Sequence, residues 1–429
     1  MHIQTVVDRV SIVPALDPAA LALFLAIFVA AALATGRRPV YGAALLAFVV
    51  PFDWQHAVLG TTMTVGKAVL AGALLAVVAR PDVRARLRRR EIATVLTAFA
   101  GVIVAIAASV AVALHRPAAV HEVLRWVEYA LVFAAIAACY AADPDAVIMR
   151  RAILASAILV CCTAFVDEVA GAPFGIWIGS FAVPRISGAL EGPNQLAGYL
   201  EIVLAVAGAW QLRQPTRLGA WTLVLTGVAL PLTFSRGSDL GVIAIAVLFA
   251  LVERSSLCRL AVAAYGLATG AAAVAFWVLL SHQALAAELF RASDFSSAAG
   301  AGLGSRRDLW RAAWFFFRHH PILGIGAGNY ELELQSAGLS GVRTHANNWY
   351  LQALAEGGIV LFVATAGWIA TVLTVALRAM RRSTWALAAA AAGIAMAVHG
   401  FVDYLVFFPK VAEAWIVLIA LGAASGDEA

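Results

Sequence analysis

The chain has 429 residues, of which 63% are hydrophobic and only 13% charged, and its net charge at pH 7 is +5. A soluble domain carries about 25% charged residues, so this composition excludes an ordinary soluble protein and indicates a polytopic membrane protein. The four cysteines exclude a disulfide framework, because they lie in or beside apolar segments, and no Cys/His set has metal-ligand spacing.

Apolar runs suited to a ~30 Å hydrocarbon core recur along the whole chain. They predict an all-α fold with 13 transmembrane helices, or 12 if the short, proline-bounded second run is re-entrant. No basic segment precedes an apolar one in Met1–Ala15, so we expect no cleavable signal peptide. The predicted spans are 18–35, 39–52, 61–79, 92–114, 126–141, 152–170, 195–211, 218–234, 239–253, 260–281, 350–377, 384–401 and 404–424.

Positive charge predicts the orientation of these spans. Alternate connections hold 17 of the 30 Lys and Arg residues, and the positive-inside rule makes those connections cytoplasmic. The net charge is therefore a topology signal, and no nucleic-acid partner is predicted. The basic connections carry Arg37, Arg38, Arg80, Arg84, Arg86, Arg88, Arg89, Arg90, Arg150, Arg151, Arg213, Arg217, Arg254, Arg259, Arg378, Arg381 and Arg382.

The same phase places the loops 53–60, 171–194, 235–238, 282–349 and 402–403 on the outer face. We predict one membrane domain over 1–429, with N-terminal helices in 18–281, a large outer loop at 282–349 and C-terminal helices in 350–424. The large loop holds six arginines and four histidines, on the side of the membrane where arginine is normally less frequent. Cations gathered there beside the bilayer suggest an anionic lipid head group as ligand.

Two outer motifs precede the large loop. Arg185 stands just before Glu191 to Asn194, where Pro193 and Asn194 open a span, and the free N–H groups of a helix start form a natural anion site. Arg236 lies in a glycine-containing break near hydrocarbon, where an arginine is costly without a partner, and Asp239 could supply one. The structural alternative for the first motif is a helix cap with an interfacial arginine, and for the second it is an ion pair.

A third motif begins at Ser305, which with Asp308 resembles a capping box. The helix should end by His320, before Pro321, and its apolar residues recur at helical spacing, as in a helix lying in the membrane interface. Arg306 and Arg307 would occupy the first turn, where they oppose the helix dipole, which favours a ligand-binding reason for them. The glycines of 324–328 predict a close-packed loop. The apolar set is Leu309, Trp310, Ala313, Phe316 and Phe317.

The fourth motif runs from Thr344 to Gln352, immediately before a span, with Glu356-Gly357-Gly358 within that span. His345 lies where a general base could meet an acceptor hydroxyl, although a lone histidine is more often structural.

In their order along the chain, these motifs resemble the O-antigen ligase and polymerase superfamily, which are polytopic C-type glycosyltransferases. The resemblance is strongest over 180–375. It implies an undecaprenyl-diphosphate-linked glycan as donor, with Arg185, Arg236 and Arg306 clamping the diphosphate and Arg307 as a substitute. It further implies a loop histidine, here His345, that activates the acceptor without a metal or other cofactor.

One departure concerns the histidine. The ligase pattern has a histidine followed by Asn, Ser or Gln, then nine residues and a glycine, and counting back from Gly358 puts Asn347 and Asn348 at the first two positions. The histidine is therefore shifted or its role has moved. Asn194, Asn347, Asn348 and Glu191 are predicted as supporting residues, with Glu191 an alternative base.

The leading hypothesis is a metal-independent inverting glycosyltransferase, O-antigen ligase-like, in the bacterial inner membrane, with its active site facing the periplasm. It would act in lipopolysaccharide or surface-polysaccharide assembly, and its acceptor would be a lipid A core, a glycan or another hydroxyl. The alternatives are a polysaccharide polymerase of the same superfamily, a cell-wall precursor polymerase, and a lipid-linked glycan flippase or transporter. The few charges within the spans favour an enzyme over a transporter.

Overall fold

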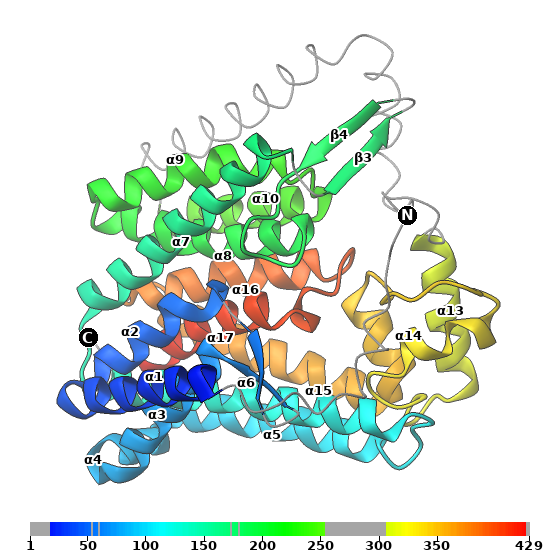
Figure 1. Cartoon of the computed structure of the whole chain (residues 1–429), viewed down its shortest axis with the longest axis horizontal. Helices are drawn as coiled ribbons and strands as arrows, with labels where there is room; N and C mark the ends of the chain where they lie inside the picture. Colours follow the sequence, from blue (N-terminus) through cyan, green and yellow to red (C-terminus); the bar gives the residue numbers. More distant parts are fainter. Residues whose placement is uncertain are drawn as a thin grey trace.

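Each predicted span that falls within the described residues contains a helix. The computed structural model describes residues 18–52, 55–58, 61–171, 174–178, 181–253 and 306–425 (Figure 1). The predicted span 260–281 and Ser305 lie outside them. The first group of helices comprises α1 (Pro18–Arg37), α2 (Pro39–Val49), α3 (Val65–Ala79), α4 (Pro81–Arg84), α5 (Arg90–Ser109), α6 (Arg116–Ala142), α7 (Ala146–Val169), α8 (Pro193–Arg213), α9 (Arg217–Leu232) and α10 (Arg236–Val252).

The second group begins after the undescribed segment. It comprises α13 (Arg306–His319), α14 (Tyr330–Glu333), α15 (Trp349–Ala379), α16 (Thr384–His399) and α17 (Pro409–Ala424), with short 3₁₀ turns at Val50–Phe52, Ala85–Arg88, Leu334–Ala337 and Leu405–Phe407. Two short antiparallel hairpins, which the sequence analysis did not predict, lie in the connections from α2 to α3 and from α7 to α8. They are β1 (Gln55–Val58) with β2 (Thr61–Thr64), and β3 (Phe174–Ile178) with β4 (Phe181–Arg185), in which Phe174 lies opposite Arg185.

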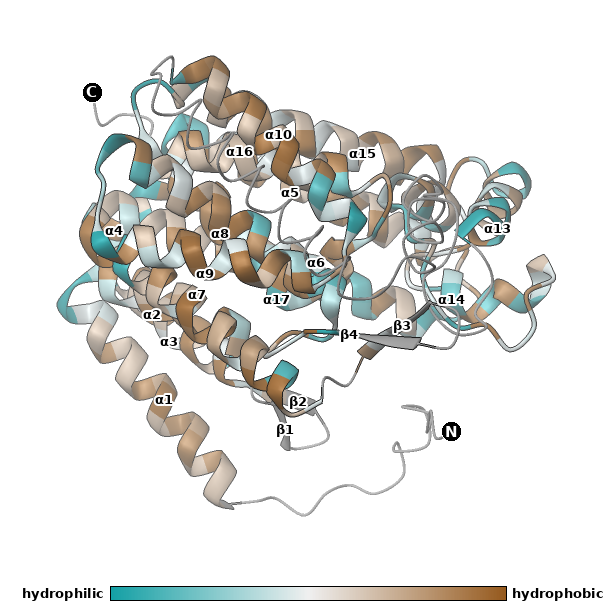
Figure 2. Ribbon diagram, turned by 90° about the horizontal axis from the view of Figure 1, so that it is seen from above, coloured by the Kyte–Doolittle hydropathy of each residue, from teal (hydrophilic) through white to brown (hydrophobic). Residues whose placement is uncertain are grey.

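The fold is that of an all-α polytopic membrane protein. Within the described part of the chain, six helices are long and apolar enough to cross a membrane: α1, α5, α6, α7, α8 and α15. Four shorter apolar helices cover Pro39–Phe52, Val65–Ala79, Arg217–Leu232 and Thr384–His399. Hydrophobic residues dominate the bundle, and hydrophilic ones gather toward its ends and around α13 and α14 (Figure 2).

Small and aromatic residues together build the centre of the bundle. The alanines of α16 from Ala386 to Ala392 are all buried, and such small side chains let helices approach closely where no solvent drives them together. Trp368 makes edge-to-face contacts with Phe99, Trp126 and Trp415, at ring-centroid distances of 5.2, 5.5 and 5.2 Å. These rings join α5, α6, α15 and α17 into one core.

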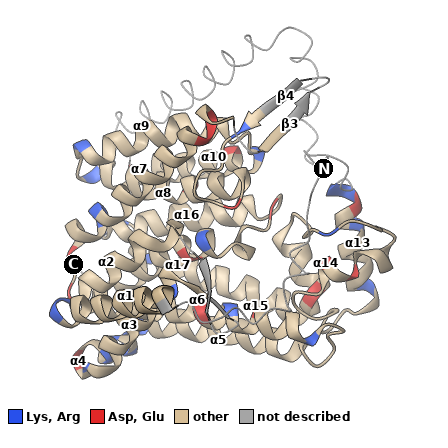
Figure 3. Ribbon diagram, viewed as in Figure 1, with Lys and Arg blue, Asp and Glu red and all other residues tan. Residues whose placement is uncertain are grey.

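The arginine-rich connections contact one another at one end of the bundle. Arg38 donates to both carboxylate oxygens of Asp143, at 3.0 and 2.8 Å. Arg213 donates to Glu253 at 2.8 Å and to the carbonyl of Met380 at 2.7 Å. These contacts place the connections with predicted cytoplasmic orientation on a common side, while α13 and α14 lie at the opposite end (Figures 1 and 3).

A break inside α15 seats the glycine-rich loop. Gly358 adopts φ +60° and ψ −157°, outside the helical region, and a Cβ there would collide with the backbone of Ile322. Backbone groups on either side of the break bond to the loop: the N–H of Ile359 donates to the carbonyl of Pro321 at 2.9 Å, and the carbonyl of Glu356 accepts from the N–H of Gly326 at 2.9 Å. The predicted close-packed loop is therefore confirmed, and it is fixed against α15 at this break.

Candidate active site

The helix α13 anchors the segment 306–348, which precedes α15. It is described from Arg306, and it ends at His319, immediately before the turn that contains Pro321, as predicted for its end. Its buried face packs on the loop's own small core, where the hydroxyl of Tyr330 donates to the carbonyl of Leu309 at 2.6 Å. The buried residues of α13 are Leu309, Ala312, Ala313 and Phe316, whereas Trp314 and Phe315 stay exposed.

The segment before α15 is held by its asparagines and glutamine. Asn348 caps α15 by accepting from the N–H of Leu351 at 2.9 Å, and its amide donates to the carbonyl of Phe401 at 2.8 Å. Gln352 accepts from the N–H of Ala346 at 2.7 Å. Asn347 adopts φ +49°, a left-handed conformation that asparagine tolerates better than most residues. These contacts fix His345 beside the turn that follows α16.

His345 lies between two carboxylates. Its Nε2 is 3.5 Å from Oδ1 of Asp403, and its Nδ1 is 3.7 Å from Oε1 of Glu331. The ring is stacked on Phe407, and the side chain is only 14% exposed. Burial by itself lowers the pKa of His345, but the two carboxylates outweigh burial and raise the pKa to about 9. The two carboxylates therefore favour the imidazolium form of His345 at neutral pH.

Asp403 joins the histidine to the arginine motifs. It is 2% exposed, its Oδ1 accepts from the N–H of Tyr404 at 2.7 Å, and its Oδ2 accepts from the amide of Asn194 at 2.7 Å. Burial would raise the pKa of Asp403, but the nearby charges of His345 and Arg306 hold it well below its usual range. Asp403 thus remains ionised as the common counter-charge of the site.

Arg185 stands at the end of β4, against the start of α8. Its Nε donates to the carbonyl of Thr233 at 2.6 Å, and its Nη2 donates to Oδ1 of Asn194 at 2.6 Å. Burial, together with the like charges of Arg306 and Arg236, lowers the pKa of Arg185 to about 10, although Asp403 opposes the shift. Three arginines from segments far apart in the sequence therefore lie within electrostatic reach of one another, and an anion would relieve their repulsion.

Some of the other predicted residues lie in this cluster, and the rest lie around it. Burial lowers the pKa of Arg306, which interacts with Asp403, whereas Arg307 beside it is exposed. Arg236 starts α10 and lies within electrostatic reach of Asp239, its predicted partner. Glu191 lies 3.8 Å from Nζ of Lys410, an ion pair that gives this carboxylate a structural partner.

Two functional candidates escaped the sequence analysis, namely Asp403 and Glu331. Asp403 lies in the outer connection 402–403, so its position relative to the predicted spans was an available signal. Glu331 follows the glycine-rich loop and carries no motif of its own. Both are recognisable only because the fold brings them to opposite sides of His345.

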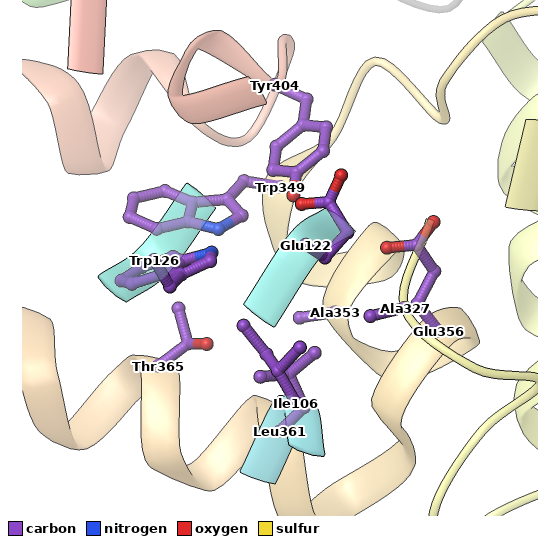
Figure 4. Close-up of a pocket in the computed structure, with 10 residues that line it drawn as sticks. All are labelled: Ile106, Glu122, Trp126, Ala327, Trp349, Ala353, Glu356, Leu361, Thr365 and Tyr404. Carbon is purple, nitrogen blue, oxygen red and sulfur yellow. The ribbon is translucent and has the colours of Figure 1, made fainter. Parts of the chain in front are cut away.

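Two cavities lie next to this cluster. The smaller, of about 10 Å³, is enclosed by Trp126, Trp349 and Tyr404 and by the carboxylates of Glu122 and Glu356 (Figure 4). The larger, of about 180 Å³, shares both glutamates and is also lined by Glu331 and Leu332 of α14. Within the described residues, no group of three or more His, Cys, Asp and Glu side chains is arranged to hold a metal ion.

The fold and this cluster define a class: a multi-pass membrane protein with buried arginines, a buried carboxylate and a histidine gathered at one end of its helix bundle. Residues 221–366 match the family model described as O-antigen ligase. The match supports membership of the O-antigen ligase and polymerase superfamily, which the motifs also indicate. No curated protein matches the chain.

Proposed function

We propose that the protein is a metal-independent inverting glycosyltransferase that transfers a glycan from undecaprenyl diphosphate to an acceptor hydroxyl at the periplasmic face of the bacterial inner membrane. One observation carries the proposal. One connected cluster lies at the end of the bundle opposite the basic connections, and it joins residues from four separate segments, namely Arg185, Arg306, Asp403 and His345. The family match supports an enzyme of this type.

The arginines hold the donor diphosphate. Arg185, Arg236 and Arg306 present positive charge where burial strengthens electrostatic interactions, and the start of α8 adds its N–H groups nearby. Negative charge grows on the diphosphate as the glycosidic bond breaks. Preorganised cations therefore stabilise the transition state more than the ground state, with Arg307 at the rim as a further contact.

His345 receives the proton of the acceptor. The acceptor oxygen attacks the anomeric carbon opposite the leaving group, the new carbon–oxygen bond forms with inversion, and undecaprenyl diphosphate leaves with the electron pair. The proton passes to the neutral form of His345, which Asp403 and Glu331 orient and then stabilise as the imidazolium. With a pKa of about 9, neutral His345 is about 1% of the total at pH 7, so the reaction favours alkaline conditions.

Asparagine side chains hold the arginine cluster and the segment of His345 in position. Asn194 links Arg185 to Asp403, and Asn348 ties the turn after α16 to the start of α15. Asn347 occupies the position at which the ligase pattern has its histidine. Its role in this proposal is to support His345, which lies two residues earlier. Glu191, paired with Lys410, serves the fold of the loop before α8.

The proposal favours a ligase-like reaction, with a lipid A core, a glycan or another hydroxyl as acceptor. The decisive test incubates the purified protein with a polyprenyl-diphosphate-linked glycan and separate acceptors in the presence of a chelator, and identifies the product by mass spectrometry. We expect one acceptor to be modified by wild-type protein. Arg306→Ala should lose about tenfold to a hundredfold in rate, because a charge-assisted hydrogen bond contributes about 1.5–3 kcal/mol.

Arg318→Ala is the matched control, since Arg318 lies on the same helix but is exposed near its far end. Transfer onto repeat units would identify a polymerase. Equal losses in the two variants would contradict the role of the arginine cluster, and absence of transfer to every acceptor would contradict the function.

A further inference from the structure

A buried pair of ionisable side chains inside the bundle takes no part in the steps described above. Nδ1 of His399 lies 2.7 Å from Oε1 of Glu201, and the two residues are 1% and 0% exposed. Glu201 belongs to α8, which is long and apolar enough to cross a membrane, and His399 is the last residue of α16. Ionisable side chains within a membrane are costly, so they pair with one another and commonly mark a functional site.

The two members of this pair depend on each other. Oε2, the second carboxylate oxygen of Glu201, is buried and has no hydrogen-bond partner among the residues that the structure describes. The contact with His399 therefore carries the compensation of this carboxylate. Loss of one partner leaves the other uncompensated in a low-dielectric interior, whereas replacement of both costs far less. We therefore expect Glu201 and His399 to behave as one unit.

The pair adjoins the turn that carries Asp403. The carbonyl of His399 accepts from the N–H of Val402 at 2.9 Å and from the N–H of Asp403 at 3.1 Å. On α8, Asn194 donates to Oδ2 of Asp403 at 2.7 Å, and it lies about two helical turns before Glu201. The helix α8 thus holds the end of α16 and the turn after it at two polar contacts, one to His399 and one to Asp403.

The pair also supports the helix that begins at Arg236. A Cβ on Gly237 would collide with the imidazole of His399, and a Cβ on Gly241 would collide with the carboxylate of Glu201. Residues four apart lie on the same face of a helix, so the first turns of α10 rest directly on the pair. The position of the pair therefore determines how closely Arg236 approaches α8 and α16.

We propose that Glu201 and His399 form a positioning pair, which holds Arg236 and Asp403 in place relative to each other and so shapes the donor site. The inference rests on the proposed function for the roles of Arg236 and Asp403, but its effect on donor-lipid binding can be measured without transfer. Neither member of the pair contacts a substrate. Both act through the residues that do.

The test is a double-mutant cycle in the full-length protein with Glu201→Gln, His399→Gln and the double variant. Glutamine removes the charge and keeps the capacity to form hydrogen bonds. Tyr140→Phe is the matched control, because it removes a buried hydrogen bond that Trp385 donates at 3.0 Å near the opposite end of α16. It therefore perturbs the packing of the same helix without touching the pair.

Three readouts are combined with the Tm of each variant. Native mass spectrometry measures binding of undecaprenyl diphosphate, hydrogen–deuterium exchange at the imidazole Cε1 measures the pKa of His345, and steady-state transfer gives the KM of donor and acceptor separately. Each single variant should weaken binding of undecaprenyl diphosphate about tenfold, and the double variant should bind no more weakly than the weaker single variant. The donor KM should rise while the acceptor KM changes less than about twofold.

The titration of His345 reports the position of Asp403. The pair carries no net charge, so its loss should change the pKa of His345 chiefly by moving Asp403 away from the imidazole. We therefore expect this pKa to fall by about one unit from its value of about 9. Tyr140→Phe should leave both the pKa and the donor binding unchanged, even where its loss of Tm equals that of a single variant.

Wild-type donor binding and an unmoved His345 pKa in both single variants would overturn the positioning pair. So would losses that multiply in the double variant, which would show two independent residues, or equal losses in Tyr140→Phe, which would show general destabilisation. If a single variant fails to accumulate, the double variant, in which no charge is left uncompensated, should still fold and bind the donor lipid about tenfold more weakly. If binding and titration follow the expected pattern and no acceptor is modified by any variant or by wild type, the pair stands and the proposed reaction falls.

Discussion

The pH dependence of transfer follows directly from the surroundings of His345. Its pKa is raised from about 6.5 to about 9, which corresponds to roughly 3 kcal/mol in favour of the charged form. If neutral His345 accepts the proton, only about 1% of the protein is competent at pH 7. We therefore expect the rate to rise about tenfold per pH unit between about 6 and 8.5 and to level off near 9.

Asp403→Asn tests the cause of this shift. The substitution removes one of the two carboxylates that face His345, so the inflection should fall by about 1–2 units, to about 7–8. The maximum rate should fall as well, because Asn194 loses the carboxylate to which its amide donates and Arg306 loses its buried counter-charge. Glu333→Gln, which leaves both carboxylates in place, should not move the inflection.

The assay is single-turnover transfer over pH 6–10, with donor and acceptor saturating at each pH. His345→Ala should lower the plateau by about 10²–10⁴ while donor binding survives. A rate that is flat or falling between pH 6 and 9 would refute His345 as the base. His345 would then act as a permanently charged imidazolium. If His345→Ala keeps the wild-type rate and Asn347→Ala loses activity, then activation of the acceptor depends on the next residues of the motif and not on His345.

The remaining predictions concern stability, charge, metal and topology. The raised pKa of His345 stabilises the fold below about pH 6.5, and this contribution is lost as pH rises through about 9, so the apparent Tm of wild type but not of His345→Gln should fall across that range. Arg185→Lys should recover little of the activity lost in Arg185→Ala, since lysine cannot reproduce the two bonds to Thr233 and Asn194, as the two rates will show. EDTA should leave the transfer rate unchanged, and restoration of a lost rate by Mg²⁺ would contradict arginine-based neutralisation. Reporter fusions after Arg90 and Arg382 should read cytoplasmic and fusions within 306–340 periplasmic, and the opposite result for the latter would remove the basis for the site.

The sequence alone determined the membrane class and the positions of the helices. Apolar length is a local property, set by the thickness of hydrocarbon that a segment must cross, and the runs therefore coincide with helices wherever the chain is described. The end of α13 before Pro321 followed from the missing N–H and fixed φ of proline in the same local way. The two small hairpins were missed, because they are short outer connections without a strong alternating pattern.

The tertiary structure decided which motif residues meet. Motifs along the sequence pointed to Arg185, Arg236, Arg306 and His345, but nothing local to any of them required Asp403 as their common partner. That residue comes from the turn between α16 and α17, more than two hundred residues after Arg185. The environment of His345 likewise depended on contacts between distant segments.

The pKa of His345 shows the physical reason most clearly. In the sequence it is a histidine beside small and polar residues, with nothing to shift its titration from the ordinary range. In the fold it lies between Glu331 and Asp403 in a buried setting, where charges interact through a low dielectric. Helices arise from interactions within a segment, whereas the charge state of a site arises from which segments the packing brings together.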